Sequence, residues 1–534
     1  MTKKTILLLI IVLLIASFFR LWQLDSIPPG LYPDEAINAN DALHTLRTNS
    51  PRVFYPENNG REGLFINLVA LSFLIFGVSI WSLRIVSAIA GILTVFGLYL
   101  FTKELFSSSK IFKKSAESLA LLSSFFLAVS FWHVNFSRIG FRGILVPLIL
   151  VFSSYFLTKG FRTKKPLFFI ISGIIFGLGF YTYIAFRLAV FLIVAVFFLE
   201  FFRNKEKKQL KQLFGLSLLF LLFIFITALP IGIYFINNPE YFVSRAAGVS
   251  IFSQPNLIKA FGESLLKHLA MFNIQGDGNW RHNIASQPVL FWPVGILFLV
   301  GLLYSIGGAI KSIKNKDYQE LFPYCYLLNW WFIMLLPGIL TYEGIPHSLR
   351  CIGAIPPVFV FSALGLFFIY NKTKLLVKIN PWAHLIPVFG LVLLILSFVF
   401  AQYSRYFLIW GTSQEVKGAF CERFVEIGNY LNSLDNDIKI YVIVNEPGVP
   451  VPYPNGIPMP AQTPMFIENI KFGGPRASYL IPENIDKINP NSKKTIIVPM
   501  KYDKELFEVL IKKFPEGEIG IQIQENIWSY LINF

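Results

Sequence analysis

The sequence has little charge for its length. Only 15% of its 534 residues are Asp, Glu, Lys or Arg, whereas soluble globular domains average about a quarter. Hydrophobic residues make up 54% of the chain, and the mean hydropathy is +0.58. The chain has more apolar residues than an ordinary soluble fold can bury. The composition therefore indicates a membrane protein.

Cysteine is also scarce. The three cysteines, Cys325, Cys351 and Cys421, have no zinc-ligand spacing and form no disulfide framework. Neither a metal nor another cofactor is indicated, although folding could bring together the acidic residues Asp34, Glu35, Glu57, Glu62 and Asp277. The net charge of +16 comes from short basic clusters between apolar runs, where membrane insertion requires them. It therefore does not indicate a nucleic-acid partner.

Long apolar runs are abundant. About eleven of them approach the roughly 20 residues that a helix needs to span a bilayer. They cover residues 5–22, 81–105, 116–136, 144–158, 167–183, 188–202, 214–236, 289–310, 324–340, 351–370 and 385–403. The first run follows Lys3 and Lys4 without a small-residue cleavage site, so we interpret it as an uncleaved helix rather than a signal peptide. The sequence predicts a polytopic α-helical membrane protein.

Lysines mark one side of the membrane. They gather in alternate loops, at residues 3–4, 103–114, 159–165, 205–211, 311–316 and 372–378. Because positive loop charge stays in the cytoplasm, these loops and the N-terminus are predicted to be cytoplasmic. An odd number of spans then places the C-terminus outside. We expect an integral protein of a prokaryotic plasma membrane.

Two outward loops are long, at residues 23–80 and 237–288. They contain stretches with helical spacing at 34–48, 63–76 and 257–271, which predict helices at the membrane surface. Beyond residue 404 the apolar runs shorten. Helices at 414–434 and 503–513 alternate with strands at 439–444 and 495–498 and with closing strands, and a loop rich in proline and glycine covers 447–464. We predict a catalytic membrane domain over 1–403 and a small extracytoplasmic α/β domain over 404–534.

An acidic pair follows the first span. Asp34 and Glu35 begin a predicted helix directly after a proline-rich segment. Acidic residues at a helix start can simply stabilise its free amides, and that alternative stays open. However, a carboxylate this close to the bilayer is costly unless it is paired or used. Since an outward carboxylate can act as a general base on a hydroxyl, both residues are candidate catalytic residues.

Arginine dominates the outward loops, whereas lysine dominates the inward ones. The planar guanidinium group binds phosphate with two hydrogen bonds, so this difference points to an anion site. An alternative is that the arginines only extend toward water at the interface. The candidate ligands for phosphate or substrate are Arg61, Glu62, Arg138, Arg142, Arg187, Arg245, Asp277, Arg281, His282, Asn283 and Arg350. We interpret His347, in another outward turn, as a hydrogen-bonded structural residue.

The order of these features resembles that of the C-type membrane glycosyltransferases. The resemblance is narrower to the branch that includes protein O-mannosyltransferases, glycosyltransferase family 39, which is related to the aminoarabinose transferase of lipid A. It covers about residues 1–403. The segments that carry it are the Asp34-Glu35 pair, Gly-Arg-Glu-Gly-Leu-Phe at 60–65, Ser-Leu-Arg at 82–84, Ser-Arg-Ile-Gly-Phe-Arg at 137–142 and Arg-His-Asn at 281–283.

The resemblance implies an inverting transfer of a monosaccharide from a polyprenyl-phosphate-linked donor to an acceptor outside the cytoplasm. Asp34 corresponds to the catalytic base of the family, and Glu35 is its neighbour in the motif. Besides the donor, the expected partners are membrane lipids and an acceptor that the sequence does not identify. Arg61 and Glu62 stand where many relatives have a His-Pro-Pro-type stretch, so the recognition of the acceptor stays open.

Two other functions remain as alternatives. A flippase or transporter of lipid-linked sugars would show intramembrane charges and internal repeats, and the predicted spans contain few of the former and none of the latter. An oligosaccharyltransferase would share the architecture. Its Trp-Trp-Asp-Tyr-Gly-like motif is absent from the tail, because the only tandem tryptophans, Trp330-Trp331, lie within a predicted span.

Overall fold

The chain divides into two compact units, each built from separate stretches of sequence. The structure is a computed structural model that describes residues 2–204, 206–242, 248–376, 385–490, 493–521 and 527–534. The membrane unit, as we call it, comprises Met1–Ile27, Glu62–Phe65 and Arg84–Gly411. The loop–tail unit comprises Pro28–Arg61, Ile66–Leu83 and Thr412–Phe534. We expected the first outer loop to belong to the membrane domain, whereas most of it groups with the tail.

Nine helical segments of the described residues are long and apolar enough to cross a membrane. They contain α1 (Lys3–Leu21), α4 (Ile80–Phe106), α7 (Leu145–Thr163), α9 (Ala189–Arg203), α10 (Lys207–Asn237), α13 (Trp292–Lys314), α14 (Tyr318–Ile339), α15 (Ile355–Leu376) and α16 (Leu385–Tyr403). Two shorter apolar helices, α5 (Ala116–Val129) and α8 (Pro166–Leu178), lie at two further predicted spans. Every predicted span therefore coincides with a helix, and the polytopic helical prediction is confirmed.

Short helices connect the long ones. The structure has α6 (Phe131–Phe136), η1 (Arg142–Ile144), η2 (Gly179–Tyr181), η3 (Ile184–Leu188), η4 (Ile251–Ser253), α12 (Leu257–Ala270), η5 (Ile352–Ala354) and a π-helix, η8 (Ser404–Trp410). Of these, α12 is the helix predicted in the second long loop. Because η1, η3 and η5 run directly into α7, α9 and α15, each of these spans starts with a tighter turn.

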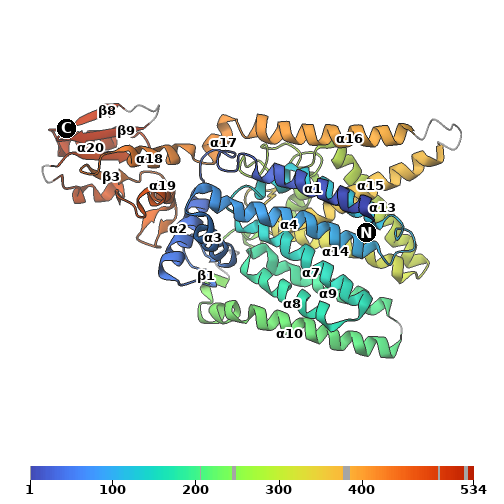
Figure 1. Cartoon of the computed structure of the whole chain (residues 1–534). Helices are drawn as coiled ribbons and strands as arrows, with labels where there is room; N and C mark the ends of the chain where they lie inside the picture. Colours follow the sequence, from blue (N-terminus) through green and yellow to red (C-terminus); the bar gives the residue numbers. More distant parts are fainter. Residues whose placement is uncertain (1, 205, 243–247, 377–384, 491–492, 522–526) are drawn as a thin grey trace. The chain divides into compact units, whose positions relative to one another are not determined.

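The long helices pack as expected of helices in lipid. In Figure 1, α7, α8 and α10 lie side by side, and α10 leaves large side chains such as Phe225 and Ile236 exposed at 63% and 79%. Between α13 and α15 the backbones approach closely, because a Cβ at Gly301 would lie only 1.8 Å from the Phe361 carbonyl oxygen. Small residues at helix contacts and apolar side chains on the outer face are typical of membrane bundles.

The loop–tail unit joins surface helices to an α/β sheet. The first loop supplies α2 (Pro33–Thr48), β1 (Phe54–Tyr55), β2 (Arg61–Glu62), which ends at the boundary between the units, and α3 (Leu64–Phe76). The tail supplies α17 (Gln414–Ala419), α18 (Glu422–Ser433), β3 (Lys439–Ile443), β4 (Pro450–Val451), β5 (Ile457–Pro458), η9 (Met459–Ala461), α19 (Gln462–Phe472), β6 (Ser478–Leu480), η10 (Pro482–Lys487), β7 (Thr495–Pro499), α20 (Lys504–Lys513), β8 (Glu518–Ile521) and β9 (Trp528–Ile532). The predicted α/β tail is therefore present.

The tail has a five-stranded sheet with the order β6-β3-β7-β9-β8. The β3 strand pairs in parallel with β6 and β7, while β9 runs antiparallel to β7 and β8. Alternate residues of a strand face opposite sides. Accordingly, Val442 packs in a core with Ile427 of α18, whereas Tyr441 packs in a second core with Leu506 and Leu510 of α20. Helices on both faces thus bury the sheet.

Candidate active-site residues

The acidic pair begins α2. Its first helical residue is Pro33, which lacks an amide hydrogen and so suits this position. Asp34 follows and is partly buried, and its Oδ1 accepts a hydrogen bond of 2.8 Å from Asn58 Nδ2. Glu35 is fully buried. The Asp34 carboxylate is thus held by a different segment of the loop, an interaction that a simple helix-start role does not require.

Asn58 lies in a left-handed turn, and its contact with Asp34 was not predicted from the sequence. Asn58, Asn59 and Gly60 have φ angles of 53°, 59° and 82°, a region that asparagine and glycine adopt most readily. A Cβ at Gly60 would lie 2.5 Å from the ring of Phe54. The Asn-Asn-Gly triplet is a turn signal that could have located the turn. It carries no information that Asp34, 24 positions earlier, is the partner.

Arg61 holds α2 in place. Its Nη1 donates to Asn38 Oδ1 at 2.9 Å, its Nη2 contacts the Asp41 carboxylate, and its Nε donates to the Glu57 carbonyl at 3.1 Å. Asn38 and Asp41 are three residues apart and so lie on one face of the helix. Because Arg61 is only 1% exposed and its three nitrogen atoms all have protein partners, it acts as a positioning residue for α2.

In the membrane unit, Glu62 and Arg142 form a buried ion pair. Arg142 Nε lies 2.8 Å from Glu62 Oε2, and both residues are less than 9% exposed. The Arg142 guanidinium also lies over the ring of Tyr183, with 5.4 Å between Cζ and the ring centroid. Two of the predicted substrate residues are therefore brought together.

Arg138, four residues earlier, is hydrogen-bonded to the protein backbone. It is fully buried, and its guanidinium donates hydrogen bonds of 2.6–3.3 Å to the carbonyl oxygens of Phe19, Trp22, Gln23 and Ile27. Phe19 lies in the last turn of α1, whose carbonyl oxygens have no partner within the helix, and the other three residues follow the end of the helix. Rings of Phe407 and Tyr406 lie at 5.0 and 5.4 Å. Arg138 therefore closes the end of the first span.

The other described arginine candidates each have partners of their own. Arg187 donates to the Phe242 carbonyl at 2.6 Å and lies over the Phe242 ring at 4.4 Å. Arg350 donates to Thr341 Oγ1 and to the Glu343 carbonyl, both at 2.8 Å. The carbonyl of Arg281 accepts from Asn135 Nδ2 at 2.7 Å. Arg245 lies outside the described residues.

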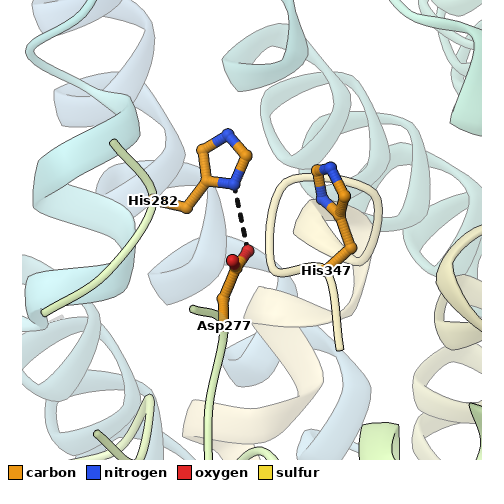
Figure 2. A group of neighbouring side chains, drawn as sticks. All are labelled: Asp277, His282 and His347. Atoms are coloured by element: carbon orange, nitrogen blue, oxygen red, sulfur yellow. Dashed lines mark hydrogen bonds and ion pairs between the residues drawn. The ribbon is translucent and has the colours of Figure 1, made fainter. Parts of the chain in front are cut away.

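Asp277, His282 and His347 come together in the membrane unit (Figure 2). His282 Nδ1 and Asp277 Oδ2 are 3.0 Å apart, and Ser348 donates to the same oxygen through its backbone N at 2.8 Å and its Oγ at 2.9 Å. Burial tends to raise the pKa of Asp277, but the hydrogen bond from His282 and the nearby histidine charges lower it below its usual value. Burial also lowers the pKa of His347.

Asn283 lies in the same loop as Asp277 and His282 and has a structural role. Its Nδ2 donates to the Gln287 carbonyl at 2.6 Å, and the side chain is 1% exposed, so it closes the loop after α12. Asp277, His282 and Asn283 were predicted together because they are close in sequence. His347 and Ser348 belong to the loop between α14 and α15, so the sequence does not place them beside this group.

Comparison with known proteins supplies the fold. The profile described as dolichyl-phosphate-mannose-protein mannosyltransferase matches residues 64–231. No curated protein sequence matches the chain. Among solved structures, ArnT from Cupriavidus metallidurans bound to undecaprenyl phosphate matches 100% of this chain and 99% of its own, with 12% identity and a TM-score of 0.56. The chain has the C-type glycosyltransferase fold.

Other proteins with the C-type fold match as well. AglB, the oligosaccharyltransferase of Archaeoglobus fulgidus, in complex with an inhibitory peptide and a dolichol-phosphate, matches with 15% identity and a TM-score of 0.52 over 99% of this chain and 74% of AglB. An oligosaccharyltransferase from the same organism, tethered to an acceptor peptide, matches with 15% identity and a TM-score of 0.50 over 83% of this chain. The present chain covers 62% of the length of that protein. The predicted C-type fold is confirmed.

Proposed function

We propose that the protein is an inverting glycosyltransferase that moves a monosaccharide from a polyprenyl-phosphate-linked donor to a hydroxyl group outside the cytoplasm. The environment of Asp34 carries this proposal. Asn58 holds Oδ1 of its carboxylate, and within the described residues Oδ2 accepts no hydrogen bond. A carboxylate oriented through one oxygen can accept a proton on the other.

In the proposed reaction, Asp34 removes the proton of the acceptor hydroxyl as the hydroxyl oxygen attacks C1 of the sugar. The bond between C1 and the phosphate oxygen breaks, and polyprenyl phosphate leaves on the opposite face, so the configuration at C1 is inverted. A phosphate needs no proton to leave if a cation stabilises its charge. We assign that role to Arg142, with Arg187 as a second candidate.

The fold supports a lipid-linked donor. The ArnT structure contains undecaprenyl phosphate, and the AglB structure contains a dolichol-phosphate. The distribution of lysine supports an active site outside the cytoplasm of a prokaryotic cell. The AglB match makes an oligosaccharyltransferase the second candidate, although the tail has no Trp-Trp-Asp-Tyr-Gly-like segment. The donor sugar, whether hexose or pentose, is left to experiment.

The test uses purified protein in lipid nanodiscs with radiolabelled polyprenyl-phosphate sugars and an extract of envelope acceptors. We expect wild-type protein to release polyprenyl phosphate and to label an acceptor. Asp34→Asn should slow transfer by about 100-fold or more, because it removes the general base. Asp25→Asn, which changes an exposed acid shortly before α2, is the matched control and should keep the wild-type rate.

Two results would contradict the proposal. If Asp34→Asn unfolds at the wild-type temperature and also transfers sugar at the wild-type rate, Asp34 is not the base. If the wild-type protein moves the donor between leaflets of a liposome without cleaving it, the protein is a flippase. Labelled lipid-linked oligosaccharides in a parallel reaction separate monosaccharide transfer from oligosaccharide transfer.

A further inference from the structure

Two loops of the membrane unit contribute a set of side chains that the proposed transfer does not use. Asp277 and His282 lie in the loop between α12 and α13, and His347 lies in the loop between α14 and α15. One ligand atom from each side chain lies within 4.8 Å of the others. Figure 2 shows the two imidazole rings on either side of the carboxylate. Two histidines and one carboxylate form a donor set that binds zinc and other first-row metals.

The distances suit a metal with little rearrangement. Bonds of about 2.0–2.2 Å to a tetrahedral ion place its ligand atoms roughly 3.3–3.5 Å apart. Asp277 and His282 are already 3.0 Å apart, and the third ligand atom lies within 4.8 Å, so the ligand atoms need to approach by at most about 1.5 Å. Asp277 Oδ2 and His282 Nδ1 are joined by a hydrogen bond. A metal ion bound by both side chains would take the place of that hydrogen bond.

Neighbouring groups hold Asp277 and His347 by hydrogen bonds, as the outer partners of a metal site hold its ligands. Ser348 donates twice to Asp277 Oδ2, and the Asn279 amide donates to Oδ1 at 2.8 Å. The backbone N of His347 donates to His268 Nε2 at 3.2 Å, while His268 Nδ1 lies 2.7 Å from the Ser264 carbonyl. Such outer partners orient the ligands and raise the affinity for metal.

Burial argues that the cluster has a ligand. Asp277 and His282 are 2% and 5% exposed, and the imidazole rings of His282 and His347 have centroids only 4.8 Å apart. Buried polar groups need hydrogen-bond partners, and a buried charge is usually paired or bound to a metal. The loop is also tightly constrained, because a Cβ at Gly276 would lie 2.3 Å from the Gln287 carbonyl oxygen.

We propose that Asp277, His282 and His347 bind a divalent transition metal such as Zn²⁺, which ties the loop between α12 and α13 to the loop between α14 and α15. Three protein ligands leave a fourth position for water. This proposal departs from the expectation of a metal-free protein drawn from the sequence. It does not depend on the proposed transferase activity.

The experiment measures metal binding directly. Full-length protein is purified in detergent, treated with a chelator and titrated with Co²⁺, whose visible absorption reports its coordination. We expect visible bands that saturate at one Co²⁺ per chain and disappear when one equivalent of Zn²⁺ is added. Adding Zn²⁺ should also raise the temperature of unfolding, because the ion binds only the folded protein.

Variants locate the site. His347→Gln should abolish both the absorption bands and the Zn²⁺-dependent rise in unfolding temperature, whereas His44→Gln, at an exposed histidine of α2, should change neither. Ser348→Ala should weaken Co²⁺ binding by about 10-fold or more, because it removes one outer hydrogen bond. If His347→Gln does not fold, His282→Cys tests the same site, since a thiolate ligand adds a charge-transfer band to the Co²⁺ spectrum.

The proposal is overturned if wild-type protein shows no Co²⁺ absorption bands and Zn²⁺ does not raise its temperature of unfolding. It is also overturned if both signals persist in folded His347→Gln, or if folded His282→Cys binds Co²⁺ with an unchanged spectrum. Wild-type sugar transfer by folded Asp34→Asn together with intact Co²⁺ bands would overturn the proposed base and support the metal site. The two proposals therefore fail separately.

Discussion

Arg138 and Arg142 lie four residues apart in the sequence, but their guanidinium groups have different partners. Arg138 satisfies carbonyl oxygens at the end of α1, including those of Phe19 and Trp22. Arg142 pairs with the buried carboxylate of Glu62. Removing Arg138 would leave buried acceptors without donors, at about 1–3 kcal/mol for each one. An alanine scan of this turn would therefore mix folding defects with catalytic ones.

A paired substitution isolates the role of Arg142. Arg142→Met alone leaves the Glu62 carboxylate buried without its cation and should destabilise the protein by about 3–5 kcal/mol. Arg142→Met combined with Glu62→Met replaces the ion pair by apolar groups, a change that is often neutral for stability. We expect the double variant to fold. If Arg142 stabilises the leaving phosphate, the double variant should lose about 10–100-fold in kcat/KM.

Two measurements check this prediction. In detergent, the unfolding temperature of the double variant should be near that of wild type, and that of the single Arg142→Met variant should be well below it. Release of polyprenyl phosphate reports the chemical step. A double variant that folds and still releases polyprenyl phosphate at the wild-type rate would show that Arg142 does not hold the leaving group. Glu62→Gln is the control that keeps the arginine.

At the scale of elements, α2 rests on α19 within the loop–tail unit. Thr463 Oγ1 donates to the carbonyl of Leu31 at 3.0 Å, just ahead of the acidic pair. Further along α2, Asn40 donates to the carbonyl and side-chain oxygens of Gln462 at 3.0 and 2.9 Å. The ring of Phe466 stacks on that of Phe73 in α3, with centroids 6.0 Å apart. The tail thus supports the helix that carries the proposed base.

This support predicts that a tail residue affects the rate. Thr463→Val keeps the volume of the side chain but leaves the Leu31 carbonyl without its donor, a loss worth about 1 kcal/mol. We expect transfer to slow by about 5-fold with little change in the KM for the donor. Ser433→Ala, at an exposed hydroxyl of α18, is the matched control. An unchanged rate in folded Thr463→Val would contradict a positioning role for this contact.

Hydrophobic periodicity and composition predicted which helices and strands exist, because these elements depend on local sequence. The apolar runs mark the spans, the spacing in residues 34–48 marks α2, and the strands at 439–444 and 495–498 became β3 and β7. Contacts between distant segments leave no such local pattern. Thr463 and Leu31 are 432 residues apart, and the carbonyls bound by Arg138 belong to the backbone, which every residue has.

Local sequence also suggested the candidate site residues. The acidic pair and the segment with Asp277 and His282 stand out as polar residues between apolar runs. Their partners do not stand out. Asn58 is an ordinary turn residue, and His347 was interpreted as a hydrogen-bonded structural histidine rather than as an acid or base. Burial of several such residues around one carboxylate became visible only through the fold.

For the whole molecule, orientation in the membrane is the property that the proposed function most requires. A lipid-linked donor that is used outside the cell needs Asp34 and the tail on that side. Positive loop charge sets orientation during insertion, and the lysine-rich loops, such as residues 205–211, are predicted to lie in the cytoplasm. The tail begins after the last of an odd number of predicted spans. One experiment on intact cells therefore tests the arrangement as a whole.

Single cysteines report the two sides. In a variant with Cys325, Cys351 and Cys421 replaced, Asn436→Cys places a thiol at an exposed position of the tail, and Lys208→Cys places one at an exposed position before α10 becomes apolar. We expect a membrane-impermeant maleimide to label only Asn436→Cys in intact cells and both variants after permeabilisation. The reverse pattern would place the lysine-rich loops outside. Asp34 would then face the cytoplasm, where a donor carried by the outer leaflet cannot reach it.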